Sequence, residues 1–293
     1  MKLTQRLVLA FYMSKMKLLA KVSPRKAAEE AFRLFCTPYT KRKIYDAPPI
    51  FSKANKLNFN MGNEQVHGFQ WWPENSNGHK ILICHGFDSY SYKFDKYIAP
   101  LLKDGFEVLA FDAPAHGLSS GKTINAALYR DTIIEICNRF GPIDGIMAHS
   151  LGGLAVALAA EKMPGNDHKR LVLIAPATES TRAIEGFFKL FPLSREIRHE
   201  FNEIIMEMGG YPASWYSVAR VVQQLTTPTF WIHDEDDTIT PFEDVQHLLD
   251  LKLPHIKFEI TKGLGHSNVY RDNEVVQKVV HYFSGLLHQP AVH

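Results

Sequence analysis

From residue 80 onward, short apolar runs alternate with longer segments in which apolar residues recur at helical spacing. An apolar run without polar alternation is typical of a parallel strand that is buried on both faces of its sheet. The repeated order of strand and helix predicts an α/β fold, in which a mainly parallel, doubly wound sheet carries helices on both faces. The predicted strands are 81–84, 106–111, 143–148, 171–175, 229–233 and 256–260, and the predicted helices are 92–103, 124–140, 151–163, 242–251 and 273–287.

Two segments interrupt this alternation. Before it, alternating apolar residues over 57–61, a Gly-Asn turn and a second run at 66–72 predict an antiparallel hairpin. Within it, segment 177–227 is rich in aromatic residues and is too long for a plain connection between a strand and a helix. We therefore expect a core formed by 49–176 and 228–293, with a helical cap inserted at 177–227.

The amino-terminal segment, residues 1–48, is basic and helical in pattern. Residues 1–26 contain seven Lys or Arg residues and no acidic residue, and a second short helix is predicted at 27–35. The segment lacks the cleavage site of a signal peptide and the roughly 20 apolar residues that a membrane-spanning helix needs. We expect helices that pack on the core or on its cap. The alternative is a weak contact of this basic helix with an anionic membrane surface.

The hexapeptide Ala-His-Ser-Leu-Gly-Gly at 148–153 lies between a predicted strand and a predicted helix. A serine in a tight strand-to-helix turn with small neighbours is typical of a nucleophile elbow, which pushes the hydroxyl of Ser150 out above the sheet. Alanine replaces the first glycine of the usual G-x-S-x-G pattern. The alternative is a serine that only caps the following helix.

Three more loops that follow predicted strands carry residues typical of a hydrolase active site. Loop 85–88 can supply a backbone N–H group to an oxyanion hole, and the glycine-bearing loop 263–266 ends in His266. The acidic loop 233–237 ends in Asp237. The order Ser150, Asp237, His266 along the chain is the order in which the triad residues of the α/β-hydrolase fold occur.

Asp237 has competitors for the role of the triad acid. Asp234 and Asp236 lie in the same loop, and Glu179 follows an earlier strand. The four-residue offset between Asp237 and Pro241 favours Asp237. His85 is expected to be structural and to bond the backbone of the oxyanion loop, and Asp112 and His116 are expected to shape a loop near the site.

With the run Asp-Ala-Pro-Ala-His-Gly-Leu-Ser at 112–119, the chain from about 57 to 287 resembles the α/β-hydrolase superfamily. Within it, the chain is similar to a group of uncharacterised bacterial capped serine hydrolases. The resemblance implies a serine hydrolase with a Ser150–Asp237–His266 triad. The backbone N–H groups of Leu151 and Phe87 are the expected oxyanion donors.

The predicted activity is cleavage of a carboxylic ester through an acyl-enzyme on Ser150, as in a carboxylesterase. The alternatives are a thioesterase or a peptidase with the same triad, and a protein of the same fold that binds a small ligand without catalysis. The cap aromatics either form the core of the cap or wall a hydrophobic acyl pocket. The candidate substrate-binding residues are His149, Phe87, Phe187, Phe188 and Trp215.

Composition limits the other functions that this chain could have. The formal net charge of +2 argues against extended nucleic-acid binding. Three scattered cysteines predict buried free thiols and a reducing compartment, and hence a cytoplasmic protein. Without an H-E-x-x-H or C-x-x-C pair, or a complete phosphate-binding loop around 121–123, we expect no metal ion and no organic cofactor.

Overall fold

The computed structural model describes residues 3–39, 46–163 and 170–288. Contacts between residues divide the chain into two units, each with its own hydrophobic core. Unit 1 combines Met1–Thr37 with Glu179–Tyr216, and unit 2 combines Pro38–Thr178 with Ser217–His293.

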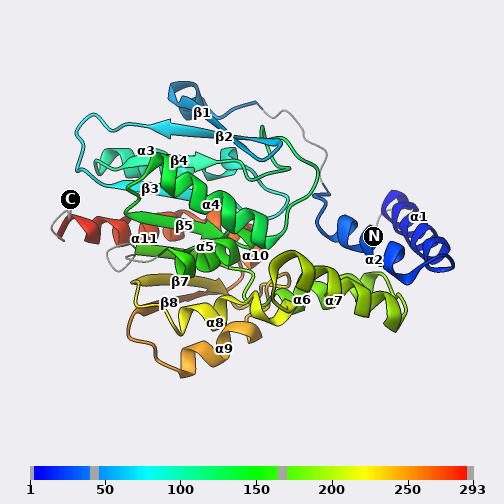
Figure 1. Ribbon diagram of the computed structural model, residues 1–293. Coiled ribbons are helices and arrows are strands. Elements are labelled where there is room, and N and C mark those ends of the chain that lie inside the picture. The colour runs from blue at the N-terminus through cyan, green and yellow to red at the C-terminus, as the bar shows by residue number, and fades with distance from the viewer. Residues whose placement is uncertain (1–2, 40–45, 164–169, 289–293) are drawn as a thin grey trace. The chain divides into compact units, whose positions relative to one another are not determined.

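In the described part of unit 2, the strands form an eight-stranded sheet in the order β1-β2-β4-β3-β5-β6-β7-β8 (Figure 1). β1 pairs antiparallel with β2, and β2 pairs antiparallel with β4. All remaining pairs are parallel. The strands are β1 (Asn55–Met61), β2 (Glu64–Trp71), β3 (Lys80–Cys84), β4 (Glu107–Phe111), β5 (Gly145–His149), β6 (Arg170–Ile174), β7 (Thr229–Asp234) and β8 (Ile256–Thr261).

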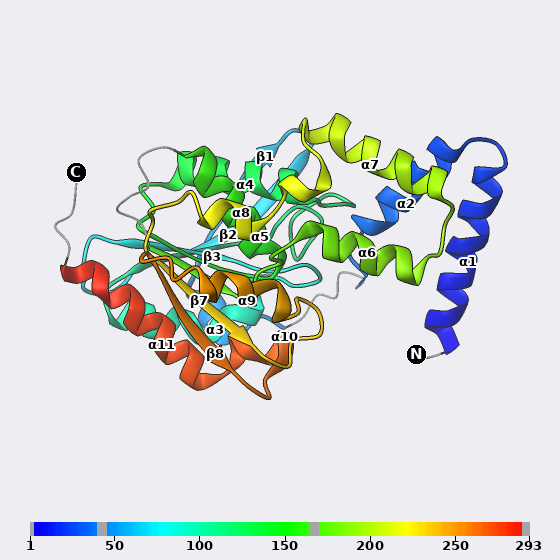
Figure 2. The same cartoon turned by 90° about the horizontal axis from the view of Figure 1, so that it is seen from below.

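Helices cover both faces of this sheet (Figure 2). On one face, α3 (Asp95–Lys103) and α11 (Asn273–Ser284) lie side by side and bury the larger hydrophobic cluster, which includes Ile81 and Phe283. The other face carries α4 (Ala126–Phe140), α5 (Leu151–Lys162) and α8 (Val218–Val222). Every residue of α5 from Gly152 to Ala160 is buried, because the helix lies between the sheet and its neighbours α4 and α8.

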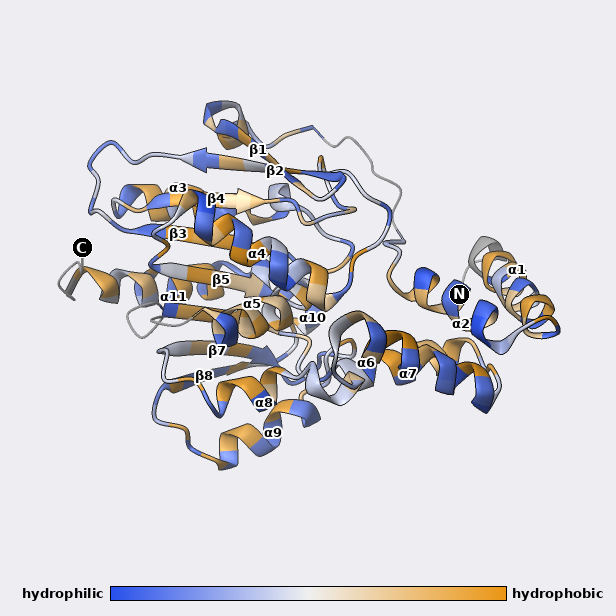
Figure 3. Ribbon diagram, viewed as in Figure 1, coloured by the Kyte–Doolittle hydropathy of each residue, from blue (hydrophilic) through white to orange (hydrophobic). Residues whose placement is uncertain are grey.

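Unit 1 consists of helices from two distant parts of the chain. They are α1 (Leu3–Ala20), α2 (Pro24–Phe35), α6 (Ser180–Leu190), α7 (Arg195–Gly209) and the short 3-10 helix η3 (Ala213–Trp215). α2 packs on α7, and α1 packs on α2. Figure 3 shows that hydrophobic and hydrophilic residues alternate along these helices. No helix among residues 3–39, 46–163 and 170–288 is long and apolar enough to span a bilayer.

The fold class predicted from the sequence is confirmed, including the hairpin that precedes the parallel strands. The contacts group the amino-terminal helices with 179–216, whereas α8, within the predicted cap 177–227, belongs to unit 2. That the inserted segment acts as a cap stays a prediction.

Several element ends differ from the predicted ones. The segment predicted as helix 92–103 begins with a 3-10 turn, η2 (Ser91–Phe94). The helix predicted at 124–140 begins at Ala126, because the side chain of Asn125 caps it by accepting from the N–H of Leu128 at 2.8 Å. The strand predicted at 143–148 is β5, which starts at Gly145. The last helix ends at Ser284 and continues as the 3-10 helix η5 (Gly285–His288).

The remaining elements are short. They are η1 (Pro49–Lys53), α9 (Glu243–Asp250), α10 (Gly265–Asn268) and η4 (Val269–Arg271).

None of the three cysteines, all of which lie in the described part of the chain, forms a disulfide bond. Cys36 and Cys84 are buried, and burial raises the pKa of the Cys36 thiol to about 12, so this thiol does not ionise at neutral pH. Cys137 is only half-buried, so the prediction of a buried thiol was wrong for it. The reason is that Cys137 lies near the end of the surface helix α4.

Candidate active site

A strained turn holds Ser150 between β5 and α5. Its backbone has φ 54° and ψ −122°, a conformation that residues other than glycine rarely adopt. The turn is tight because α5 approaches its neighbours closely. A Cβ atom on Gly152 would lie 2.5 Å from the carbonyl oxygen of His85, and one on Gly153 would lie 2.6 Å from Cβ of Pro176. The small residues of the hexapeptide therefore permit the elbow geometry.

Ser150, His266 and Asp237 form one chain of hydrogen bonds. Oγ of Ser150 lies 3.0 Å from Nε2 of His266, and Nδ1 of His266 lies 2.8 Å from Oδ2 of Asp237. A carboxylate only accepts hydrogen bonds, so Nδ1 carries the proton and Nε2 is free to accept from the serine hydroxyl. His266 is located in the one-turn helix α10 and not in the flexible loop expected from the sequence.

The carboxylate of Asp237 is held by a tight loop. Its Oδ1 accepts from the N–H groups of Ile239 and Thr240, and its Oδ2 accepts from the hydroxyl of Thr240 at 2.8 Å. Burial alone would raise the pKa of Asp237. The hydrogen bond and charge of His266 and the bonds from Thr240 outweigh it and lower the pKa to about 2. Asp237 is therefore ionised at neutral pH.

Thr240 is a site residue that the sequence analysis missed. Besides its bond to Asp237, its hydroxyl lies 3.2 Å from Nδ1 of His266. The sequence placed Thr240 directly before Pro241, but nothing in that pattern indicated which neighbours its side chain would contact.

The two other aspartates of the loop bind backbone groups instead of the imidazole. Asp234 accepts from the N–H groups of Leu264 and Gly265, and Asp236 accepts from the N–H of Gly263. These bonds tie the loop after β7 to the segment that carries the histidine. Glu179, the third competitor, belongs to unit 1.

His149 supports the backbone of the histidine segment. It is 5% exposed, and its Nε2 lies 3.0 Å from the carbonyl oxygen of His266. Its ring packs against the rings of His266 and Tyr270, with centroids 4.7 and 4.4 Å apart. Burial, together with the nearby His266, lowers the pKa of His149 to about 3, so it is neutral at pH 7. A carbonyl cannot donate, so the proton of His149 is on Nε2.

The loop after β3 lies against the elbow. A Cβ atom on Gly86 would lie 2.8 Å from Cβ of Ser150 and 2.9 Å from Nδ1 of His149, so only glycine fits there. Within the described part of the chain, the N–H groups of Phe87 and Leu151 donate to no other group. Such unpaired N–H groups beside a serine hydroxyl are what an oxyanion hole requires.

The histidine at the start of this loop is structural. Nδ1 of His85 lies 2.7 Å from the carbonyl oxygen of Gly86, and its Nε2 accepts from the N–H of Ala113 at 2.9 Å. Burial lowers the pKa of His85 to about 4. His116 holds the same loop, because its Nε2 accepts from the N–H of Asp88.

Three of the predicted substrate-binding residues take part in the packing of unit 1. Phe187 and Phe188 are buried in its core against Phe201, with ring centroids 5.9 and 5.2 Å from that ring. Trp215 stacks on Tyr211 at 4.0 Å and an interplanar angle of 11°. This packing accounts for their apolar side chains, and their contact with substrate stays a prediction.

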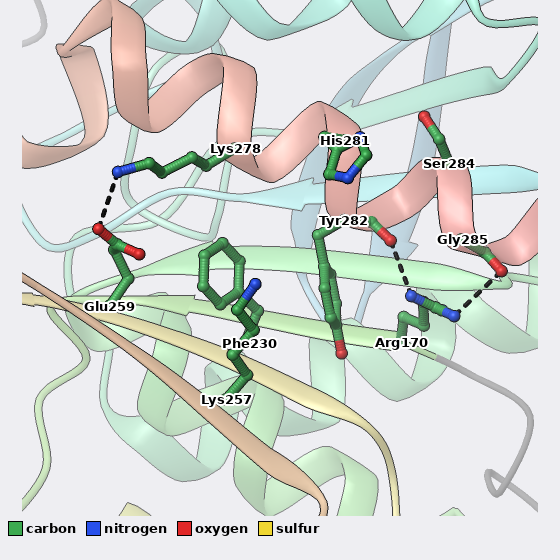
Figure 4. A pocket seen from close by; sticks show the side chains of 9 residues that line it. All are labelled: Arg170, Phe230, Lys257, Glu259, Lys278, His281, Tyr282, Ser284 and Gly285. Carbon is green, nitrogen blue, oxygen red and sulfur yellow. Dashed lines mark hydrogen bonds and ion pairs between the residues drawn. The ribbon is translucent and has the colours of Figure 1, made fainter.

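A separate cavity of about 350 Å³ lies near the amino ends of β6, β7 and β8, beside α11 (Figure 4). Most of its charged side chains link elements of the fold. Arg170 donates to the carbonyl oxygens of Tyr282 and Gly285, and Lys278 pairs with Glu259. Ligands of open α/β sheets bind at the carboxyl ends of the strands, where Ser150 follows β5. We therefore assign no ligand to this cavity.

A mainly parallel sheet with a serine elbow and a Ser–His–Asp hydrogen-bond chain is the arrangement of α/β-hydrolases. The chain belongs to the Alpha/beta hydrolase family, whose model matches residues 81–278.

Curated relatives match part of the chain. The uncharacterized protein YqkD of Bacillus subtilis is 25% identical over 214 residues, which cover 66% of this chain and 66% of that protein. Methylesterase 9 of Arabidopsis thaliana is 28% identical over 144 residues, which cover 45% of this chain and 52% of that protein. The chain thus spans just under two thirds of the first relative and about half of the second.

Solved structures share the fold. Est1E of Butyrivibrio proteoclasticus, solved with ferulic acid bound, superposes with a TM-score of 0.65 at 18% identity and covers 80% of this chain and 100% of that chain. The esterase Pf2001 of Pyrococcus furiosus gives a TM-score of 0.58 at 20% identity, with 86% and 96% covered. At this level of identity they support the architecture only.

Proposed function

We propose that this protein is a serine hydrolase that cleaves a carboxylic ester through an acyl-enzyme on Ser150. The observation that carries the proposal is the continuous hydrogen-bond chain from Oγ of Ser150 through His266 to Asp237, with distances of 3.0 and 2.8 Å. The positive φ of Ser150 adds to it, because strained backbone concentrates at functional sites.

In the first half-reaction, Nε2 of His266 takes the proton of the Ser150 hydroxyl while Oγ attacks the acyl carbonyl carbon. The carbonyl π bond breaks, and its electron pair moves to the oxygen. The N–H groups of Leu151 and Phe87 stabilise this oxyanion, and the amino end of α5 adds its partial positive charge. The bond to the leaving alcohol then breaks, and His266 returns the proton to that alcohol.

In the second half-reaction, water attacks the acyl-enzyme and His266 removes its proton. The carboxylic acid is released, and Ser150 regains its hydroxyl proton from His266. Asp237 keeps the imidazole in the tautomer that has its proton on Nδ1 and stabilises the imidazolium formed in each half-reaction. Its pKa of about 2 keeps the carboxylate charged throughout.

An ester is the substrate class that the relatives favour. One curated relative is named a methylesterase, and one neighbour in fold is named an esterase. A second neighbour bears the name lipase, and a third is named a thioesterase domain. Hydrolysis of matched oxygen and sulfur esters, compared by kcat/KM, separates the carboxylesterase from the thioesterase.

The activated serine is tested by labelling with a fluorophosphonate, which reacts with nucleophilic serines without requiring a known substrate. We expect the label on Ser150 of the wild type, located by mass spectrometry of peptides. Ser150→Ala is expected to take no label, and neither is His266→Ala, because the hydroxyl then lacks its base. A label on another serine, or a folded wild type that takes none, contradicts the proposal and favours a ligand-binding protein without catalysis.

Gly86→Ala is expected to lower kcat about a hundred- to a thousandfold, the loss typical for one oxyanion donor. The new Cβ would lie 2.8 Å from Cβ of Ser150, so the loop that carries the N–H of Phe87 must move. Ester hydrolysis, normalised to the concentration of folded protein, measures the effect.

The matched control is Gly186→Ala in α6, where a Cβ atom meets nothing within 4 Å. This variant is expected to keep its kcat, and its thermal stability should be equal or higher, because alanine is the better helix former by roughly 1 kcal/mol. Wild-type turnover in Gly86→Ala would show that the loop does not supply an oxyanion donor.

A further inference from the structure

Helix α1 of unit 1 is apolar on two opposite faces, and only one of them is covered. On the covered face, Met16 is fully buried, and Leu9 and Met13 pack against the same cluster. On the other face, Phe11 and Leu18 are 64% and 65% exposed. A surface helix normally has one apolar stripe and a polar opposite face, so the second apolar face of α1 is unusual.

The exposed apolar residues form one stripe. Leu7, Phe11 and Leu18 are spaced by four and seven residues, so they fall on one line along the helix. Leu7 is 62% exposed, and Val22, just beyond the end of the helix, extends the stripe at 74%. Single exposed apolar residues are common, but several exposed apolar residues on one line of a helix indicate an interaction surface.

Unpaired basic residues flank this stripe. Arg6, Lys17 and Lys21 are exposed, and none of them has a carboxylate partner among the residues that the structure describes. At 100° per residue, they cluster along one side of the stripe. Lys15, in contrast, pairs with Glu30 of α2 at 2.8 Å.

We propose that α1 lies in the interface of an anionic membrane, with Leu7, Phe11 and Leu18 toward the acyl chains and Arg6, Lys17 and Lys21 on the lipid phosphates. Apolar and cationic side chains side by side, without any acidic residue in residues 1–28, suit a surface that is both apolar and negatively charged. A second copy of the chain fits less well, because its α1 would bring the same positive charges to the interface.

The proposal is tested by flotation of the full chain with vesicles of phosphatidylcholine alone or mixed with phosphatidylglycerol. We expect binding to the mixed vesicles, and its loss at high salt. The triple variant R6E, K17E and K21E is expected to lower partitioning at least about a hundredfold. The control K53E, K56E and K103E makes the same change in net charge on exposed residues of unit 2, and should bind like the wild type.

A second variant tests the apolar stripe. Phe11→Glu with Leu18→Glu leaves the covered face of α1 unchanged, so it should fold and unfold like the wild type while losing vesicle binding. Deletion of α1 and α2 would be a poorer test, because it removes Met16 and Ala28 from the core of unit 1.

Three results overturn the proposal. The first is that the wild type binds neither kind of vesicle. The second is equal binding by the triple variant and its control. The third is a wild-type dimer in sedimentation equilibrium that Phe11→Glu with Leu18→Glu dissociates, which assigns the stripe to a second copy. Because vesicle binding needs no turnover, its failure is distinguishable from failure of the proposed esterase activity.

Discussion

Replacing His266 by alanine is expected to lower kcat about a millionfold, as much as replacing Ser150, and the double replacement is expected to lower it no further. The two residues act as one unit, because the nucleophile is active only while Nε2, 3.0 Å from Oγ, can take its proton. Once either is lost, the other has no function in the reaction. The rate that remains comes from binding and from the oxyanion donors.

Single-turnover and steady-state hydrolysis of an activated ester give the rates of Ser150→Ala, His266→Ala and the double variant. Circular dichroism and thermal unfolding confirm that each is folded, which is expected because the buried carboxylate of Asp237 keeps its bonds from Ile239 and Thr240 when His266 is truncated. Losses that add up in the double variant would mean that Ser150 and His266 act independently, and would contradict the proposed mechanism.

Asp237→Asn is expected to lower kcat about ten thousandfold at neutral pH. Oδ1 of Asp237 accepts two N–H bonds, so an amide in its place keeps its oxygen there and turns its NH₂ group toward His266. The imidazole then accepts at Nδ1 and carries its proton on Nε2. In that tautomer it cannot accept the proton of Ser150.

Asp236→Asn is the matched control. Asp236 is exposed and accepts from the N–H of Gly263, so we expect its kcat to fall less than tenfold. A ten thousandfold loss in Asp236→Asn, with little loss in Asp237→Asn, would reassign the triad acid.

The local spacing of apolar residues was sufficient to predict most strands and helices of unit 2. The buried parallel strands β3 and β5 have apolar runs at 81–84 and 145–148, and such runs can be recognised in the sequence without knowledge of their neighbours. The predicted ends were less accurate, because they depend on contacts such as the cap that the side chain of Asn125 provides.

The geometry of the site was only partly accessible from the sequence. The structure brings Ser150, His266 and Asp237 together, because each follows the carboxyl end of a strand in one parallel sheet. The contacts of Thr240 and Tyr270 were not foreseen, because they depend on how two loops distant in sequence lie against each other.

The packing of unit 1 was the least predictable part. Helical spacing indicates that α2 and α7 exist, but it does not indicate which apolar face each one meets. The sequence analysis therefore left open whether the amino-terminal helices pack on the core or on its cap, and α2 packs on α7, which lies within the segment predicted as the cap.

Because unit 1 takes its helices from both sides of the first six strands, the order of synthesis on the ribosome matters for it. Ala31 leaves the exit tunnel 170 residues before Phe201, with which it shares a core. At translation rates of about 5–20 residues per second, the apolar side of α2 waits roughly 10 to 30 s for its partner. During that interval the apolar surfaces of α1 and α2 are exposed on the nascent chain. Exposed apolar surface of this kind is what ribosome-bound chaperones shield.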